Sequence, residues 1–258
     1  SAREGTQKPL PKKAARYRYL LLRGMLWKGV PGYMEPNLRR LRELGLDARF
    51  IDTDGAAGHG ANARAVQNAV RESDKPVILI GHSKGALDAL SALLAAPELQ
   101  RKVSRLVALQ SPYFGTGVGD AILFGLPLDP TRAMYARPFR EAFLARPLSL
   151  FKAILELSRR RRAGLPDRRP NLRPGLKLYS VGTRRPGEAG DGVLTAEHAV
   201  FPGSHFALID GPDHLDTVLG PRASAPARGR VARYAEDLTE GLLRWILQSR
   251  PTLARRGH

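Results

Sequence analysis

The chain has 258 residues, 43% of them hydrophobic, with no cysteine and a formal net charge of +18 at pH 7. This length can bury the core of one α/β domain, and the apolar content argues against disorder. Without cysteine, disulfides and thiol chemistry are excluded, and zinc sites lose their usual ligands. The excess of lysine and arginine favours anionic surfaces, although a solvated basic surface explains it equally well.

Three further classes of feature are missing from the sequence. No apolar run approaches the ~20 residues of a membrane span. Residues 1–18 are polar and basic and lack the apolar core of a signal peptide. We find no nucleic-acid-binding motif and therefore expect no nucleic-acid partner. The compartment and the oligomeric state stay open.

Short apolar runs alternate with helical patterns along most of the chain, after a basic tail at residues 1–15 that we expect to be flexible. Strands are predicted at residues 17–22, 48–52, 76–80, 105–109, 176–181 and 205–209. Helices are predicted at residues 35–44, 61–72, 86–94, 139–160 and 231–248. This alternation indicates an α/β fold, with helices on both faces of a mostly parallel sheet and right-handed crossovers.

The alternation breaks between residues 117 and 174, a stretch rich in proline and arginine. We predict that this stretch is a helical cap inserted into a single domain of residues 1–258. The apolar residues that would share one face of its helix are Phe143, Leu148, Phe151 and Leu155. An apolar face followed by four arginines suits a lid that opens at an anionic lipid surface. The alternative is a helix packed on the core with a solvated basic end.

The sequence Gly-His-Ser-Lys-Gly at residues 81–85 follows an apolar run and precedes a helical pattern. A serine on a sharp turn between a strand and a helix is typical of a nucleophile elbow, because the turn lifts the hydroxyl clear of the sheet. Ser83 is therefore the candidate nucleophile of a serine hydrolase. The alternative is a plain glycine-lined turn.

A serine nucleophile needs a base to take its proton and an acid to orient that base. In α/β-hydrolases the three follow in the order Ser, Asp/Glu, His. Asp191, flanked by glycines in the loop after residues 176–181, is the candidate acid, with Glu188 and Glu197 as alternatives. Alone, an Asp-Gly pair is typical of an ordinary turn. His214 is the candidate base, because it directly follows the last predicted strand and catalytic groups gather at such strand ends.

The negative charge that develops on the substrate needs two backbone N–H donors. Lys84, the residue after the candidate nucleophile, would supply one. The second is expected from the loop after the first strand, at Met25 or else Leu26, although Met25 could simply pack there. The aromatic residues that would line an acyl pocket, or only pack the surrounding loops, are Trp27, Tyr33, Tyr113 and Phe114.

Four segments carry a resemblance to a known family. They are Arg23-Gly24-Met25-Leu26, residues 81–85, Ser111-Pro112-Tyr113-Phe114-Gly115-Thr116, and Asp191-Gly192-Val193 together with Asp213-His214-Leu215-Asp216. In these segments the chain resembles the bacterial triacylglycerol lipases of the α/β-hydrolase superfamily. The resemblance implies an α/β-hydrolase fold, a triad of Ser83, Asp191 and His214, and oxyanion amides from Met25 and Lys84.

The resemblance also places Asp216 where some of these lipases have a calcium-binding aspartate. No second aspartate completes such a site, so we expect no cofactor, with calcium at Asp216 as the weak candidate and a helix-capping carboxylate as the alternative. Arg23 and Tyr113 stand where these lipases have histidine, and the cap has no matching segment. These departures concern the range of substrates more than the chemistry.

We therefore expect an enzyme that hydrolyses carboxylic esters through an acyl-enzyme intermediate. Lipid or medium-chain acyl esters are the expected substrates, and an anionic membrane surface is a candidate partner. A polyester depolymerase, a thioesterase or an acyltransferase would use the same triad. Outside enzymes, the alternative is a catalytically silent basic binding module, because a fold alone does not guarantee chemistry.

Overall fold

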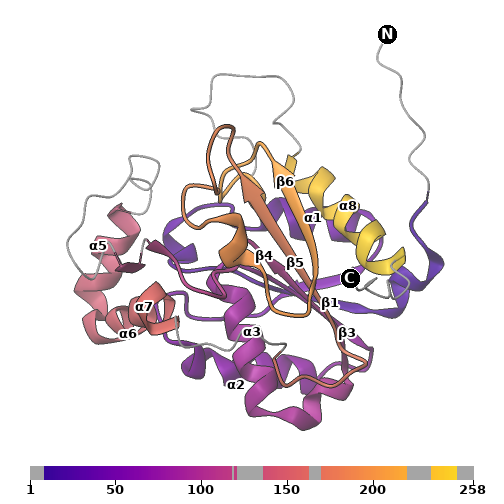
Figure 1. Cartoon of the computed structure of the whole chain (residues 1–258). Helices are drawn as coiled ribbons and strands as arrows, with labels where there is room; N and C mark the ends of the chain where they lie inside the picture. The colour runs from indigo at the N-terminus through magenta and orange to yellow at the C-terminus, as the bar shows by residue number, and fades with distance from the viewer. Residues whose placement is uncertain (1–8, 118, 121–135, 163–169, 220–233, 249–258) are drawn as a thin grey trace, which may run out of the picture.

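The computed structural model describes residues 9–117, 119–120, 136–162, 170–219 and 234–248 (Figure 1). Among these residues, six strands form one sheet in the order β2-β1-β3-β4-β5-β6, and every neighbouring pair is parallel. The strands are β1 (Arg18–Leu22), β2 (Asp47–Phe50), β3 (Val77–His82), β4 (Val103–Leu109), β5 (Lys177–Arg184) and β6 (His205–Asp210). The predicted α/β class with a parallel sheet is confirmed.

The apolar pattern of each strand follows from its place in the sheet. All six residues of the central strand β3 are buried, because helices cover both of its faces. In contrast, exposure alternates along β6, which lies at one edge of the sheet. Continuous apolar runs therefore belong to the centre of the sheet and the alternating pattern to its edge.

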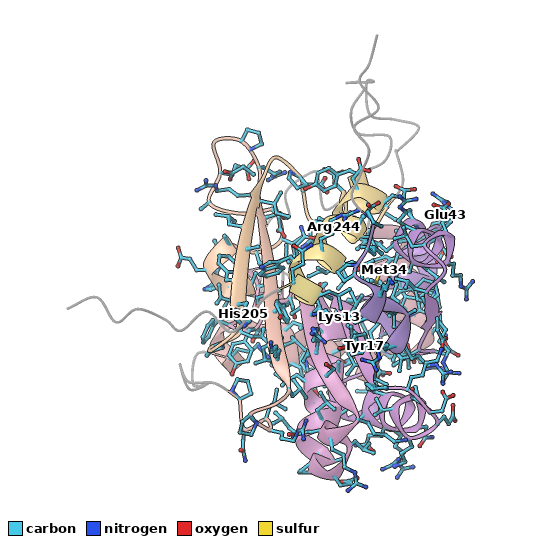
Figure 2. All side chains as sticks on the ribbon, turned by 90° about the vertical axis from the view of Figure 1, so that its right-hand side faces the viewer. Lys13, Tyr17, Met34, Glu43, His205 and Arg244 are labelled. Carbon is cyan, nitrogen blue, oxygen red and sulfur yellow. The ribbon has the colours of Figure 1, made fainter. Side chains whose placement is uncertain are left out.

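Helices cover both faces of the sheet. They are α1 (Glu35–Glu43), α2 (His59–Arg71), α3 (Lys84–Ala95), α5 (Ala136–Ala145), α6 (Pro147–Leu157), α7 (Arg159–Arg162) and α8 (Tyr234–Gln248). Helices α2 and α3 share one apolar core with the sheet, and α1 and α8 share the other (Figure 1). In Figure 2, α8 with Arg244 lies between α1 with Glu43 and the edge strand with His205.

Two predicted elements differ from the structure. The single helix predicted at residues 139–160 is wrong: the chain breaks at Arg146, where φ is −148°, and α6 begins at Pro147. Proline lacks an N–H and disfavours helical backbone in the residue before it. The flexible tail predicted at residues 1–15 is wrong from residue 12, because η1 (Lys12–Arg16) is a 3-10 helix with Ala14 buried. Residues 1–8 and the predicted start of the last helix at 231–233 lie outside the described residues.

The helices between β4 and β5 leave most of the predicted apolar face exposed. Leu150 and Ile154 of α6 are buried against Leu26, in the loop that follows β1. In contrast, Phe143, Leu148 and Phe151 are exposed by 52%, 85% and 55%. Three of the four residues of the predicted apolar face are therefore exposed, and Leu155 is half-buried. Within the described chain, we find no helix that combines the length and the apolar character needed to cross a membrane.

Candidate active site

Ser83 lies on a strained turn between β3 and α3. Its φ is +51° and its ψ is −126°, a conformation that L-residues rarely adopt. The flanking glycines permit it, since a Cβ on Gly85 would lie 2.5 Å from the carbonyl oxygen of Leu22, and one on Gly81 would overlap the backbone of Ala86. The predicted strand–turn–helix is thus present, with backbone strain of the kind that clusters at functional sites.

Asp191 and His214 form a buried pair at the carboxyl edge of the sheet. The Nδ1–H of His214 donates to Asp191 Oδ2 at 2.8 Å, and the His214 backbone N–H donates to the Asp191 carbonyl oxygen at 3.0 Å. Since an ionised carboxylate only accepts, Nδ1 carries a proton, so in the neutral imidazole the lone pair lies on Nε2. This is the tautomer that a general base requires.

The surroundings of Asp191 keep its carboxylate ionised. Burial acts to raise its pKa, but the charge and hydrogen bond of His214 act against it. The N–H groups of Val193 and Leu194 also donate to Oδ1, at 2.9 and 3.0 Å. Together they hold the pKa of Asp191 below its ordinary value.

Ser83 and the His214 loop meet through His82, the residue before the candidate nucleophile. The rings of His82 and His214 are 4.8 Å apart, and His82 Nε2 lies 2.9 Å from the His214 carbonyl oxygen. In this structure no hydrogen bond joins Ser83 to His214. Such bonds are often long before substrate binds.

His82 itself is an interior group that the sequence analysis did not select. Burial, with a smaller contribution from the charge of His214, lowers its pKa to about 3, so it is neutral. Its Nε2 faces a carbonyl oxygen and therefore carries the proton, and its Nδ1 accepts from the Tyr33 hydroxyl at 2.6 Å. The motif contained His82, but nothing local indicated these partners.

The loop after β1 passes directly over the candidate nucleophile. A Cβ on Gly24 would lie 3.1 Å from the Cβ of Ser83. The N–H of Leu26 donates to the carbonyl oxygen of Gly55 at 3.4 Å, whereas the N–H of Met25 has no acceptor among the described residues. This geometry favours Met25 over Leu26 as the oxyanion donor.

Lys84 is the first residue of α3, so its backbone N–H has no acceptor within the helix. Its side chain is buried, and Nζ lies 2.8 and 2.9 Å from the two carboxylate oxygens of Asp88. Asp88 also accepts from Asn62 at 2.8 Å and lies 2.6 Å from His59 Nδ1. The backbone N–H of His59 donates to Glu156 of α6 at 2.7 Å. The side chain of Lys84, the predicted oxyanion residue, is therefore held by a buried network of polar groups.

Two of the predicted substrate-binding aromatics are engaged in packing. The guanidinium of Arg23 stacks 3.3 Å from the centroid of the Trp27 ring. Tyr113 is only 4% exposed and meets Phe114 edge to face at 4.9 Å. Contact of either side chain with substrate stays a prediction.

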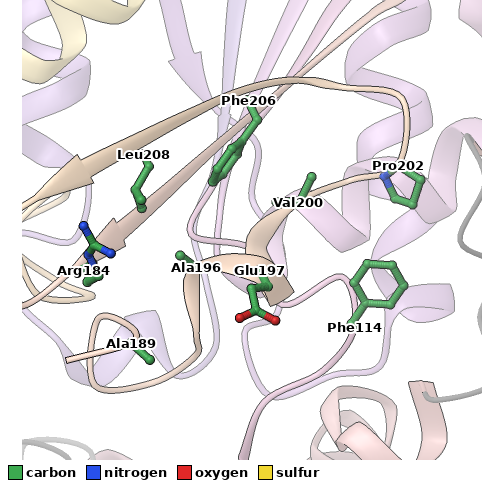
Figure 3. A pocket seen from close by; sticks show the side chains of 9 residues that line it. All are labelled: Phe114, Arg184, Ala189, Ala196, Glu197, Val200, Pro202, Phe206 and Leu208. Atoms are coloured by element: carbon green, nitrogen blue, oxygen red, sulfur yellow. The ribbon is translucent and has the colours of Figure 1, made fainter. Parts of the chain in front are cut away.

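Phe114 lines a groove of about 540 Å³ beside the edge strand β6 (Figure 3). The residues that line it are Phe114, Arg184, Ala189, Ala196, Glu197, Val200, Pro202, Phe206 and Leu208. Glu197, an alternative acid, is exposed in this groove, and Glu188 pairs with Arg185 instead. Of the three predicted acids, only Asp191 bonds to His214.

Asp216 lies in the loop that carries His214. Its carboxylate accepts the backbone N–H of Asp213 at 2.9 Å, as a turn-stabilising group does. Among the described residues, no three His, Cys, Asp or Glu side chains gather to hold a metal ion. Calcium binding at Asp216 gains no support from this arrangement and stays a prediction.

Comparisons with known proteins concern the fold of the chain. No family model matches the chain, and no curated protein matches it in sequence. Among solved structures, a metagenomic carboxyl esterase, MGS0156, is similar with a TM-score of 0.72 and 20% identity, over 95% of this chain and 79% of the esterase. The mature lipase BlEst2 of Bacillus licheniformis gives 0.64 and 19%, over 90% and 92%.

A phospholipase, PlaB of Legionella pneumophila, gives a TM-score of 0.58 and 13% identity, over 86% of this chain and 59% of PlaB. At these identities the likeness shows the fold alone. The chain therefore has the α/β-hydrolase fold that its sequence predicts.

Proposed function

We propose that this protein hydrolyses carboxylic esters through an acyl-enzyme intermediate on Ser83, with His214 as base and Asp191 as its orienting acid. One observation carries the proposal. The Asp191–His214 pair, bonded at 2.8 Å, contacts His82, the residue directly before a serine on a strained turn with φ of +51°. The fold, shared with carboxylesterases and lipases, supports the same class of reaction.

The proposed reaction follows from the proton positions. With Nδ1–H held by Asp191, His214 Nε2 takes the Ser83 proton as Oγ attacks the ester carbonyl. The N–H groups of Met25 and Lys84 stabilise the oxyanion. His214 then protonates the leaving alcohol, which leaves the acyl group on Ser83. Water loses a proton to His214 and attacks the acyl-enzyme, and His214 then gives that proton to Ser83 Oγ as the acid leaves.

We further propose lipid or medium-chain acyl esters as substrates, presented at an anionic surface. The apolar side chains exposed on α5 and α6 support this choice, among them Leu144 at 75% and Leu148 at 85%. Basic residues stand exposed beside them, at Arg140, Arg146 and Lys152. An apolar face with a basic border suits contact with anionic lipid.

The proposal is tested with p-nitrophenyl esters from acetate to palmitate, with and without anionic vesicles. Ser83→Ala should lose turnover, whereas Ser91→Ala, a half-buried serine on the same helix α3, should keep it. The optimum of chain length then separates lipid esters from short esters. Absence of turnover in the unmodified protein at every length would overturn the proposal and direct assays to thioesters and polyesters.

A further inference from the structure

A glutamine occupies an unfavourable backbone conformation at the end of β4. Gln110 directly follows the strand, is fully buried and has a φ of +46°. Residues other than glycine, asparagine and aspartate are uncommon at positive φ. Such a conformation persists only where the surrounding structure fixes it. The contacts of its side chain supply the reason.

The amide nitrogen of Gln110 faces oxygens on three segments. It donates to Asp191 Oδ2 at 3.1 Å and to the Asp213 carbonyl oxygen at 3.0 Å, and it also contacts the hydroxyl of Thr183. A carboxylate and a carbonyl only accept hydrogen bonds. The orientation of the amide is therefore dictated by its neighbours.

The amide oxygen of Gln110 faces donors. It accepts from the hydroxyl of Thr217, and it lies 3.1 Å from His82 Nε2. That nitrogen carries a proton because it also faces the His214 carbonyl oxygen. Both ends of the amide are thus matched, and the group joins the elbow, the acid loop and the base loop.

We propose that Gln110 is a positioning residue for the Asp191–His214 pair, an inference that rests on the proposed function. Gln110 donates to the same Oδ2 that accepts the His214 Nδ1–H, so it holds that oxygen on the line of the imidazole. It acts through Asp191 and does not touch the substrate.

Two variants test this role. Gln110→Glu keeps the shape but replaces the donor by a carboxyl group. It should lower kcat by about 10- to 100-fold with little change in KM. Because an added carboxylate beside Asp191 favours protonated His214, the acid limb of kcat/KM should move to higher pH. Gln110→Gly relieves the positive φ but leaves the buried partners of the amide unpaired, so it should lose kcat and lower Tm, and kcat is measured well below that Tm.

Gln100, in the 3-10 helix Pro97–Arg101 that precedes β4, provides a matched control. It is also buried, donating to the Leu93 carbonyl oxygen at 2.9 Å and accepting the Arg173 N–H at 2.7 Å. Gln100→Glu should leave kcat and the pH profile unchanged, whatever it does to Tm. Wild-type kcat and pH profile in both Gln110 variants would overturn the positioning role.

The positioning role would also be overturned if Gln100→Glu lowers kcat and moves the pH profile as Gln110→Glu does. If instead the unmodified protein is inactive, or Ser83→Ala is active, the proposed function fails first and the inference with it. Failure of the proposed function and failure of the positioning role are therefore distinguishable, because only the first is measured on the unmodified protein and Ser83→Ala.

Discussion

The replacement Asp191→Asn would put an NH₂ donor where the carboxylate now accepts hydrogen bonds only. Oδ1 of Asp191 accepts two backbone N–H groups, from Val193 and Leu194. Oδ2 faces His214 Nδ1 and Gln110 Nε2. Asparagine keeps one oxygen, which best remains with the two N–H groups, so its NH₂ turns towards His214. His214 must then accept at Nδ1 and carry its proton on Nε2.

That tautomer cannot take a proton from Ser83. In the well-studied Ser-His-Asp proteases, the same replacement lowers kcat by about 10⁴ through the wrong tautomer. We expect a fall of about 10³- to 10⁴-fold here, or about 4 to 5.5 kcal/mol at 1.36 kcal/mol for each factor of ten. KM should change little, because Asp191 is buried and is not placed to touch the substrate.

The assay measures kcat and KM for a p-nitrophenyl ester between pH 5 and pH 10. Glu197→Gln serves as the control, since this alternative acid is exposed and bonds to neither Ser83 nor His214. Activity of Asp191→Asn within tenfold of wild type would refute the tautomer argument. Loss of activity in Glu197→Gln but not in Asp191→Asn would show that the acid was assigned to the wrong residue.

Two further predictions concern groups around the elbow. Since the pKa of His82 is about 3 when folded and 6.5 ordinarily, its contribution to stability is complete above pH 6.5 and is lost as pH falls towards 3. Unfolding in urea should show a loss of about 2 kcal/mol between pH 7.5 and pH 5 that His82→Asn abolishes, and equal pH slopes would contradict it. Gly24→Ala should lower kcat by about 10²–10³, because its Cβ meets Tyr33 and Ser83 and lifts the oxyanion loop. Gly60→Ala, with nothing within 4 Å, is its control, and equal activities would contradict the oxyanion role.

The sheet and the turn that carries Ser83 could be predicted because their signals are local. The strand predicted at residues 76–80 became β3 (Val77–His82), since a central parallel strand needs an unbroken apolar run. Asp191 and His214 were selected by order along the chain, and they prove to be bonded. Gln110 was missed because its partners lie up to 107 residues away, and a glutamine after a strand has no pattern of its own.

The segment between β4 and β5 shows where periodicity fails. Helix α6 carries apolar side chains around most of its circumference, so the pattern alone does not define which face is buried. Leu150 and Ile154 pack inward because the loop after β1 presents Leu26 there. Leu148 and Phe151, selected by the same criterion of spacing, remain exposed. The contact with Leu26, and not the apolar pattern of α6, therefore determines which face of the helix is buried.

Lys84 combines two demands at the elbow, and the buried network satisfies both. In the proposed reaction its backbone N–H must be free for an oxyanion, while its buried ammonium needs a counter-charge. The ion pair with Asp88, one turn along α3, achieves this and fixes the first turn of the helix. Asp88 in turn is held by His59, whose backbone is bonded to Glu156 of α6. A chain of contacts through Glu156, His59 and Asp88 therefore connects α6 to the first turn of α3, where Lys84 lies.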